Sequence, residues 1–133
     1  CNMSQSTNDV IPTAFNIAAL SLLNRKLYPA VDGLIATFKR MEEKYKDVVK
    51  LGRTHIQDAV PITFGQEVSG WRAALENAKA MIEMASQTFY YSSLGATAVG
   101  TGSTCPLKKG YAKYACAALN KVLKTTKFKV TPN

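Results

Sequence analysis

The sequence predicts an all-α protein made of long antiparallel helices that pack side by side in a bundle. Two stretches carry apolar residues at alternating intervals of three and four, the spacing of a helix that packs along its length. The chain has 133 residues, 47% of them hydrophobic, which is enough for one core-forming domain. The first series is Val31, Leu34, Phe38, Met41, Tyr45 and Val48, and the second is Val68, Trp71, Leu75, Ala78, Ile82, Ala85 and Phe89.

The first long helix is expected over about residues 10–48. Polar residues precede it, and Asn8 or Asp9 is suited to cap its first turn. Pro12 fits that turn because the first backbone N–H groups of a helix need no partner within it. Pro29 removes a backbone donor and crowds the preceding turn, so a kink is expected near residue 29.

A polar loop over residues 52–61 is expected to separate this helix from a second one over about residues 63–92. Thr63 and Gln66 form a capping-box pattern at its start. The second apolar series is regular over three heptads, which indicates packing between nearly parallel helix axes. Trp71 is therefore expected in the core or at an interface.

The second polar loop covers residues 94–104, and its glycines permit unusual backbone angles. It does not end in Gly-Lys-Ser/Thr and it follows a helix instead of a strand, which argues against nucleotide binding. A shorter, basic helix is expected over about residues 106–124, followed by a tail that resembles a truncated strand or loop. The loop glycines are Gly95, Gly100 and Gly102.

Composition excludes several classes of function. The net charge of +8 is spread along the helices without a recognisable motif of stacking aromatic residues, which indicates a solvated or anion-attracting face and not a nucleic-acid interface. Cys1, Cys105 and Cys116 share no CxxC spacing and there is one histidine, so no metal site, disulfide framework or cofactor is expected. Scattered thiols suit a reducing cytoplasm. No apolar run reaches the roughly 18 residues of a membrane span, and the early polar residues indicate that the chain begins inside a longer protein.

Candidate functional residues lie in the polar segments at the helix ends. His55, with Thr54 beside it, occupies a break between helices, where a histidine is placed to handle protons. Ser6, Thr7 and Asn8 supply neutral donors ahead of a helix N-terminus, an arrangement that favours a carboxylate. The alternatives are a solvent-exposed histidine in a polar turn and simple helix capping by the other three residues.

Four segments together resemble the class II fumarase and aspartase superfamily. They are Ser-Gln-Ser-Thr-Asn-Asp (4–9), Gly-Arg-Thr-His-Ile-Gln-Asp-Ala (52–59), Gly-Gln-Glu (65–67) and Gly-Ala-Thr-Ala-Val-Gly-Thr-Gly (95–102). The resemblance implies a homotetrameric lyase built around a helical bundle, with each active site assembled from loops of three subunits. Such enzymes eliminate water or ammonia from a four-carbon dicarboxylate to give fumarate. Residues 1–133 would then form a single fragment, mainly of the central bundle domain.

The resemblance also implies a role for each candidate. Ser6 and Thr7 would bind the carboxylate next to the acidic carbon and stabilise it as an enediolate-like dianion develops. Asn8 and His55 would contact the leaving group, with His55 as the catalytic residue that orients or shuttles a proton. Thr54 would bind the other carboxylate of the substrate.

The sequence departs from the family pattern in two places. Ser103 and Thr104 follow the glycine loop, where relatives usually have Leu-Asn. The family's Gly-Ser-Ser-x-Met-Pro-x-Lys-x-Asn segment, which carries the proton-abstracting serine, is absent from these residues, so this chain alone is expected to be inactive.

Thr7 favours an aspartate ammonia-lyase, a carbon–nitrogen lyase, because fumarases more often have a second serine at this point. Ser69-Gly70-Trp71 instead resembles the fumarase pattern, which leaves a fumarate hydratase acting on malate and fumarate as the alternative. A further alternative is an inactive helical module that associates with itself through the two apolar series.

Overall fold

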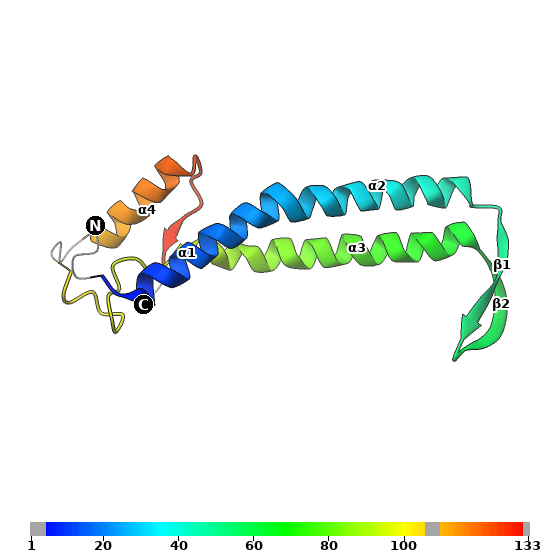
Figure 1. Cartoon of the computed structure of the whole chain (residues 1–133), viewed down its shortest axis with the longest axis horizontal. Coiled ribbons are helices and arrows are strands. Elements are labelled where there is room, and N and C mark those ends of the chain that lie inside the picture. Colours follow the sequence, from blue (N-terminus) through cyan, green and yellow to red (C-terminus); the bar gives the residue numbers. More distant parts are fainter. Residues whose placement is uncertain (1–4, 106–109, 132–133) are drawn as a thin grey trace. The chain divides into compact units, whose positions relative to one another are not determined.

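The computed structural model describes residues 5–105 and 110–131. The chain divides into two compact units, one containing residues 1–23 and 85–133 and the other residues 24–84. Helices dominate both units, and the strands are short (Figure 1). The predicted helical fold class is confirmed.

The unit of residues 24–84 is a pair of antiparallel helices, α2 (Tyr28–Lys44) and α3 (Phe64–Ser86), joined by a hairpin (Figure 1). Aromatic rings pack between the helices: the ring centroids of Phe38 and Trp71 are 6.0 Å apart, and those of Tyr45 and Phe64 are 5.2 Å apart. Val68 is fully buried. All but Phe64 belong to the predicted apolar series, but other members of the same series, Leu34, Val48 and Ile82, are exposed. Trp71 nevertheless keeps 46% of its surface exposed.

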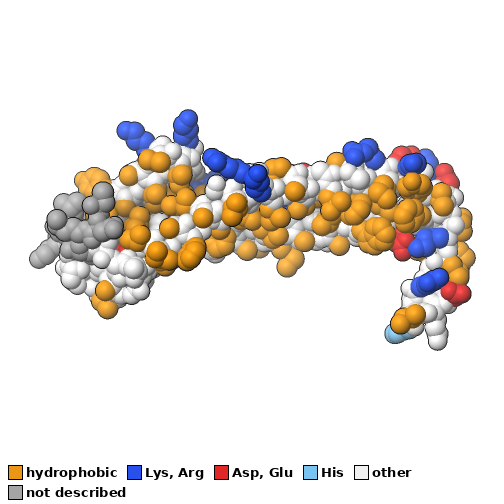
Figure 2. Space-filling view, in the orientation of Figure 1, with side chains coloured by type: hydrophobic (Ala, Val, Ile, Leu, Met, Phe, Trp, Pro, Cys, Tyr) orange, Lys and Arg blue, Asp and Glu red, His pale blue; other side chains and the backbone are white. Residues whose placement is uncertain are grey.

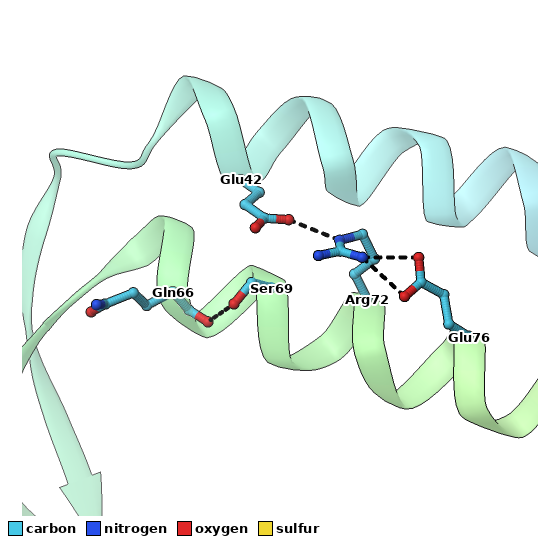
Figure 3. A network of polar contacts seen from close by, with 5 residues as sticks. All are labelled: Glu42, Gln66, Ser69, Arg72 and Glu76. Carbon is cyan, nitrogen blue, oxygen red and sulfur yellow. Dashed lines mark hydrogen bonds and ion pairs between the residues drawn. The ribbon is translucent and has the colours of Figure 1, made fainter.

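Ion pairs connect the same two helices. Arg72 donates from Nε to Glu42 Oε2 on α2 (2.8 Å) and from Nη1 to both carboxylate oxygens of Glu76 on α3 (2.9 Å), as Figure 3 shows. Hydrogen bonding to Glu42, and then to Glu76, raises the pKa of Arg72. Lys79 Nζ lies 2.7 Å from Asp32 Oδ1 one to two turns further along. In Figure 2 acidic and basic side chains gather around the hairpin end of this unit, and orange hydrophobic surface remains along the helices.

The expected loop over residues 52–61 is instead the outer part of an antiparallel β-hairpin. Strand β1 (Val49–Thr54) pairs with β2 (Gln57–Thr63), with Val49 opposite Thr63 and Thr54 opposite Gln57. The register shifts beside Gly52, where a Cβ atom would lie 2.7 Å from the carbonyl oxygen of Val60. The polar composition concealed this hairpin, because its two-residue turn lacks the Asn-Gly or Asp-Gly pair that usually marks one.

The start of α3 follows the predicted capping box. The Thr63 backbone N–H donates to Gln66 Oε1 (2.9 Å), and the Gln66 N–H donates to Thr63 Oγ1 (3.1 Å). Before α2, the expected interruption takes the form of a π-helical segment, η1 (Leu23–Leu27), and Pro29 occupies the first turn of α2. A residue other than proline at this position would donate its N–H to the carbonyl oxygen of Arg25, which lies inside the π-helical segment.

The other unit contains α1 (Thr7–Leu22), the 3-10 helix η2 (Gln87–Tyr90), β3 (Tyr91–Ser92), α4 (Tyr111–Val122) and β4 (Lys129–Val130). α1 contacts η2 and β3, and β3 pairs in parallel with β4, so the tail is a short strand. The long helix expected to reach residue 92 therefore ends at Ser86 as an α-helix. Residues 106–109, the expected start of the third helix, lie outside the described part.

A small core holds this unit together. Its buried apolar side chains are Leu20, Cys105, Cys116 and Phe128, and Tyr90 packs edge-on against Phe128 at 5.3 Å. Burial raises the pKa of the Cys116 thiol, and a hydrogen bond with Ser92 opposes that shift. Among the described residues, no helix is long and apolar enough to cross a membrane.

Candidate active site

The first candidate group forms the N-terminus of α1. Ser6 is the N-cap: its Oγ accepts from the Asn8 backbone N–H at 3.1 Å. The helix thus starts at Thr7, earlier than the expected cap at Asn8 or Asp9. Thr7 is exposed, and no described residue shares a hydrogen bond with its hydroxyl. This end of the helix combines the hydroxyls of Ser6 and Thr7 with the positive end of the helix dipole, which suits an anion.

Asp9 ties this helix start to the glycine loop. Its side chain is only 1% exposed. Oδ1 accepts from the Ser6 backbone N–H (3.0 Å), while Oδ2 accepts from the N–H groups of Gly95 (3.3 Å) and Thr97 (3.1 Å). Asn8 adds a second link, because its Nδ2 donates to the carbonyl oxygen of Ala98 at 3.0 Å.

The glycine loop has the unusual backbone expected of it. Gly95, Gly100 and Gly102 all have positive φ, and so does the buried Thr97 (φ 64°). A Cβ atom on Gly102 would lie 2.8 Å from the carbonyl oxygen of Gly95, so only glycine fits this crossing. Ser103, at the departure from the family pattern, accepts from the Thr101 hydroxyl at 3.0 Å and is exposed.

The second candidate group occupies the tip of the hairpin. His55 and Ile56 are the two central residues of the turn, with φ of 50° and 64°. Both are exposed, Ile56 to 98%, and Thr54 ends β1 directly before them. Arg53 and Asp58 face each other across the strands, with 3.8 Å between Arg53 Nε and Asp58 Oδ1. The fold therefore presents His55 outward, with no described residue bonded to its imidazole.

The five candidates fall in different units. Ser6, Thr7 and Asn8 come together within the first unit, while Thr54 and His55 are neighbours within the second. The first unit also has a cavity of about 380 Å³, lined by the glycine loop and the start of α4, but none of the five residues lines it. In the part of the chain that the structure describes, no three His, Cys, Asp or Glu side chains gather to hold a metal ion.

Sequence reasoning missed two features of these groups. Asp9 is the acidic partner of a reciprocal cap and not the N-cap itself, and the signal for this is an acidic residue three positions after a serine. The hairpin was missed as well. Its signal was the set of β-branched residues on either side of the polar tip, which are Val48, Val49, Val60 and Ile62.

Comparison with known proteins places these features in a family. A family model described as Lyase matches residues 1–133. The chain is 47% identical over 133 residues to a class II fumarate hydratase of Brucella suis, covering 99% of this chain and 28% of that protein. It is 52% identical over 101 residues to the class II fumarate hydratase of Thermus aquaticus, covering 76% of this chain and 22% of that one.

A solved structure agrees. The crystal structure of a fumarate lyase:delta crystallin from Brucella melitensis matches with a TM-score of 0.89 and 40% identity, over 99% of this chain and 28% of that one. The present chain thus spans about a quarter of the length of these relatives.

These relatives overturn the expectation of an aspartate ammonia-lyase. That expectation rested on Thr7, but threonine and serine both present a hydroxyl donor at this position, so the exchange does not separate the two activities. The relatives at 47% and 52% identity are named class II fumarate hydratases, which favours the alternative indicated by Ser69-Gly70-Trp71. The chain belongs to the lyase family of the fumarase and aspartase superfamily.

Proposed function

We propose that these residues are part of a hydro-lyase that interconverts malate and fumarate. The observation that carries the proposal is the 47% identity to a class II fumarate hydratase over 99% of the chain. The geometry supports it, because two separate parts of the chain present groups suited to a small dicarboxylate: hydroxyl donors at the positive end of the α1 dipole, and an exposed imidazole at the hairpin tip.

The start of α1 would bind the carboxylate beside the carbon that loses its proton. As that proton leaves, charge moves onto the carboxylate oxygens, and donors already in place stabilise the dianion without reorganisation. Thr7 has a hydroxyl without a partner among the described residues, and Ser6 adds its own beside the helix N-terminus. Asn8 keeps one amide hydrogen and Oδ1 after bonding to Ala98, so it is able to contact the leaving hydroxyl.

The hairpin tip would supply the second half of a site. Thr54 would bind the other carboxylate, and His55 would give a proton to the departing hydroxyl or hold the water formed from it. Because the turn projects His55 away from its own strands, we propose that it enters a site completed by other subunits of a homotetramer. The base that removes the carbon-bound proton is assigned to none of these residues.

The test is turnover by the full-length protein that contains this sequence. Conversion of malate to fumarate, followed by the ultraviolet absorbance of fumarate, is expected, and release of ammonia from aspartate is the comparison assay. Replacing Ser6 with alanine is expected to lower turnover by about 10²–10³, the usual loss of a donor to a developing oxyanion. Ser21→Ala, an exposed change on the same helix, is the matched control. A folded full-length protein that turns over neither malate nor fumarate would refute the proposal.

A further inference from the structure

Asp9 is a buried carboxylate whose bonds join two distant parts of the chain. It accepts three hydrogen bonds from backbone N–H groups. One donor is Ser6, at the start of α1, and the other two are Gly95 and Thr97, nearly ninety residues later. Its side chain is 1% exposed, so water does not replace these bonds if they are lost. The carboxylate therefore fixes the helix start relative to the glycine loop.

The surrounding bonds reinforce the same link. The backbone oxygen of Asp9 accepts from the hydroxyls of Thr13 (2.9 Å) and Ser93 (3.1 Å). The Asn8 amide donates to the Ala98 oxygen of the same loop. Asp9 is thus held through its backbone as well as its side chain.

The loop adopts an unfavourable backbone to make these contacts. Thr97 has a φ of 64°, in the left-handed region that non-glycine residues rarely adopt, and its N–H is one of the two that point at Oδ2. Strain of this kind persists where surrounding bonds hold it and is concentrated at functional sites.

We propose that Asp9 is a positioning residue, which together with the loop of residues 95–98 sets the position of Ser6, Thr7 and Asn8 for carboxylate binding. The inference rests on the proposed function, because it concerns the same three residues. Asp9 has no contact with substrate in this scheme: both of its oxygens are occupied by backbone donors, and it acts through the N-cap.

Asp9→Asn is the sharpest test because it keeps the shape of the side chain. Oδ1 and Oδ2 both accept, so an asparagine in either orientation turns its NH2 group toward at least one N–H donor. In the full-length tetramer we expect kcat/KM for malate to fall by about 10- to 100-fold, since a misplacement of about 1 Å has effects of this size. Asp47→Asn makes the same chemical change at an exposed carboxylate and is expected to leave kcat/KM within about twofold.

A double mutant separates positioning from a general loss of stability. If Asp9 acts in part through Ser6, Asp9→Asn lowers kcat/KM by a smaller factor in the Ser6→Ala background than in the wild-type enzyme, because the two changes remove a shared interaction. Thr13→Val breaks the bond to the Asp9 backbone oxygen and lowers stability without touching the carboxylate. Two results would overturn the proposal. One is a double mutant whose loss of kcat/KM equals the product of the two single losses. The other is a Thr13→Val enzyme that has the same melting temperature as Asp9→Asn and loses as much kcat/KM.

Hydrogen–deuterium exchange gives a readout that does not depend on substrate. Peptides covering residues 93–99 are expected to exchange faster in Asp9→Asn than in wild type. In Asp47→Asn their exchange rate is expected to equal that of wild type. If the wild-type protein does not turn over malate, the proposed function is refuted. The exchange measurement still reports whether Asp9 holds the loop. Unchanged exchange in Asp9→Asn would refute the positioning role even in an active enzyme.

Discussion

Replacing Ile56 with glycine is expected to stabilise the hairpin. Ile56 has a φ of 64°, in the left-handed region that β-branched residues rarely adopt, and its side chain is 98% exposed. The substitution therefore relieves backbone strain of roughly 1–2 kcal/mol without removing buried apolar surface. Glycine also has more conformational freedom in the unfolded chain, and this lowers the stabilisation by about 0.5–1 kcal/mol. The net expectation is about 0.5–1 kcal/mol in favour of the variant, from these two terms.

The assay is amide hydrogen exchange of residues 49–63 in the full-length protein. A gain of that size corresponds to exchange slower by roughly two- to fivefold. Lys124→Gly is the matched control, because Lys124 is also exposed and has a φ of 50°, but lies after α4 in the other unit. It is expected to stabilise its own region and to leave hairpin exchange unchanged.

Activity supplies the second half of this prediction. Glycine at position 56 removes the side chain beside His55 and permits more backbone conformations at that one position, so kcat/KM for malate is expected to fall even though the native turn is less strained. Faster hairpin exchange in Ile56→Gly, while Lys124→Gly slows exchange around α4, would refute the reasoning from strain.

Three further outcomes are expected. His55→Ala should leave the melting temperature nearly unchanged, because the side chain is exposed, while turnover of malate drops by about 10²–10⁴; a variant with normal turnover would contradict the assigned role. Arg72→Met should lower the midpoint of unfolding in urea only slightly, since the ion pairs to Glu42 and Glu76 are partly exposed and screened by solvent, and a large shift of the midpoint would contradict this. Burial raises the pKa of Cys116, so near pH 9 iodoacetamide should alkylate it more slowly in the folded than in the urea-unfolded protein, as read by mass spectrometry; equal rates would contradict this. The sign follows because the folded state keeps the thiol protonated to higher pH, and only the thiolate reacts.

The helices could be predicted because their signals are local. Spacing of three and four along Val31 to Val48 and Val68 to Phe89 corresponds to the faces on which Phe38, Tyr45, Val68 and Trp71 meet other side chains. Thr63 and Gln66 make the capping box that their order predicts, since both partners lie within one helical turn. The hairpin was not predictable in the same way, because its turn uses His55 and Ile56, residues that favour other backbone conformations.

The sequence by itself determined the helical class and the superfamily and predicts five candidate residues, because heptad spacing and short motifs are properties of neighbouring positions. It did not separate malate from aspartate, since one hydroxyl exchanged for another at Thr7 changes no hydrogen-bonding capacity. Only the tertiary structure revealed that the carboxylate of Asp9, next in sequence to Ser6, Thr7 and Asn8, meets the N–H groups of Gly95 and Thr97. Those contacts join positions nearly ninety residues apart, and which backbone donors a buried carboxylate meets is decided by the folding of the whole unit.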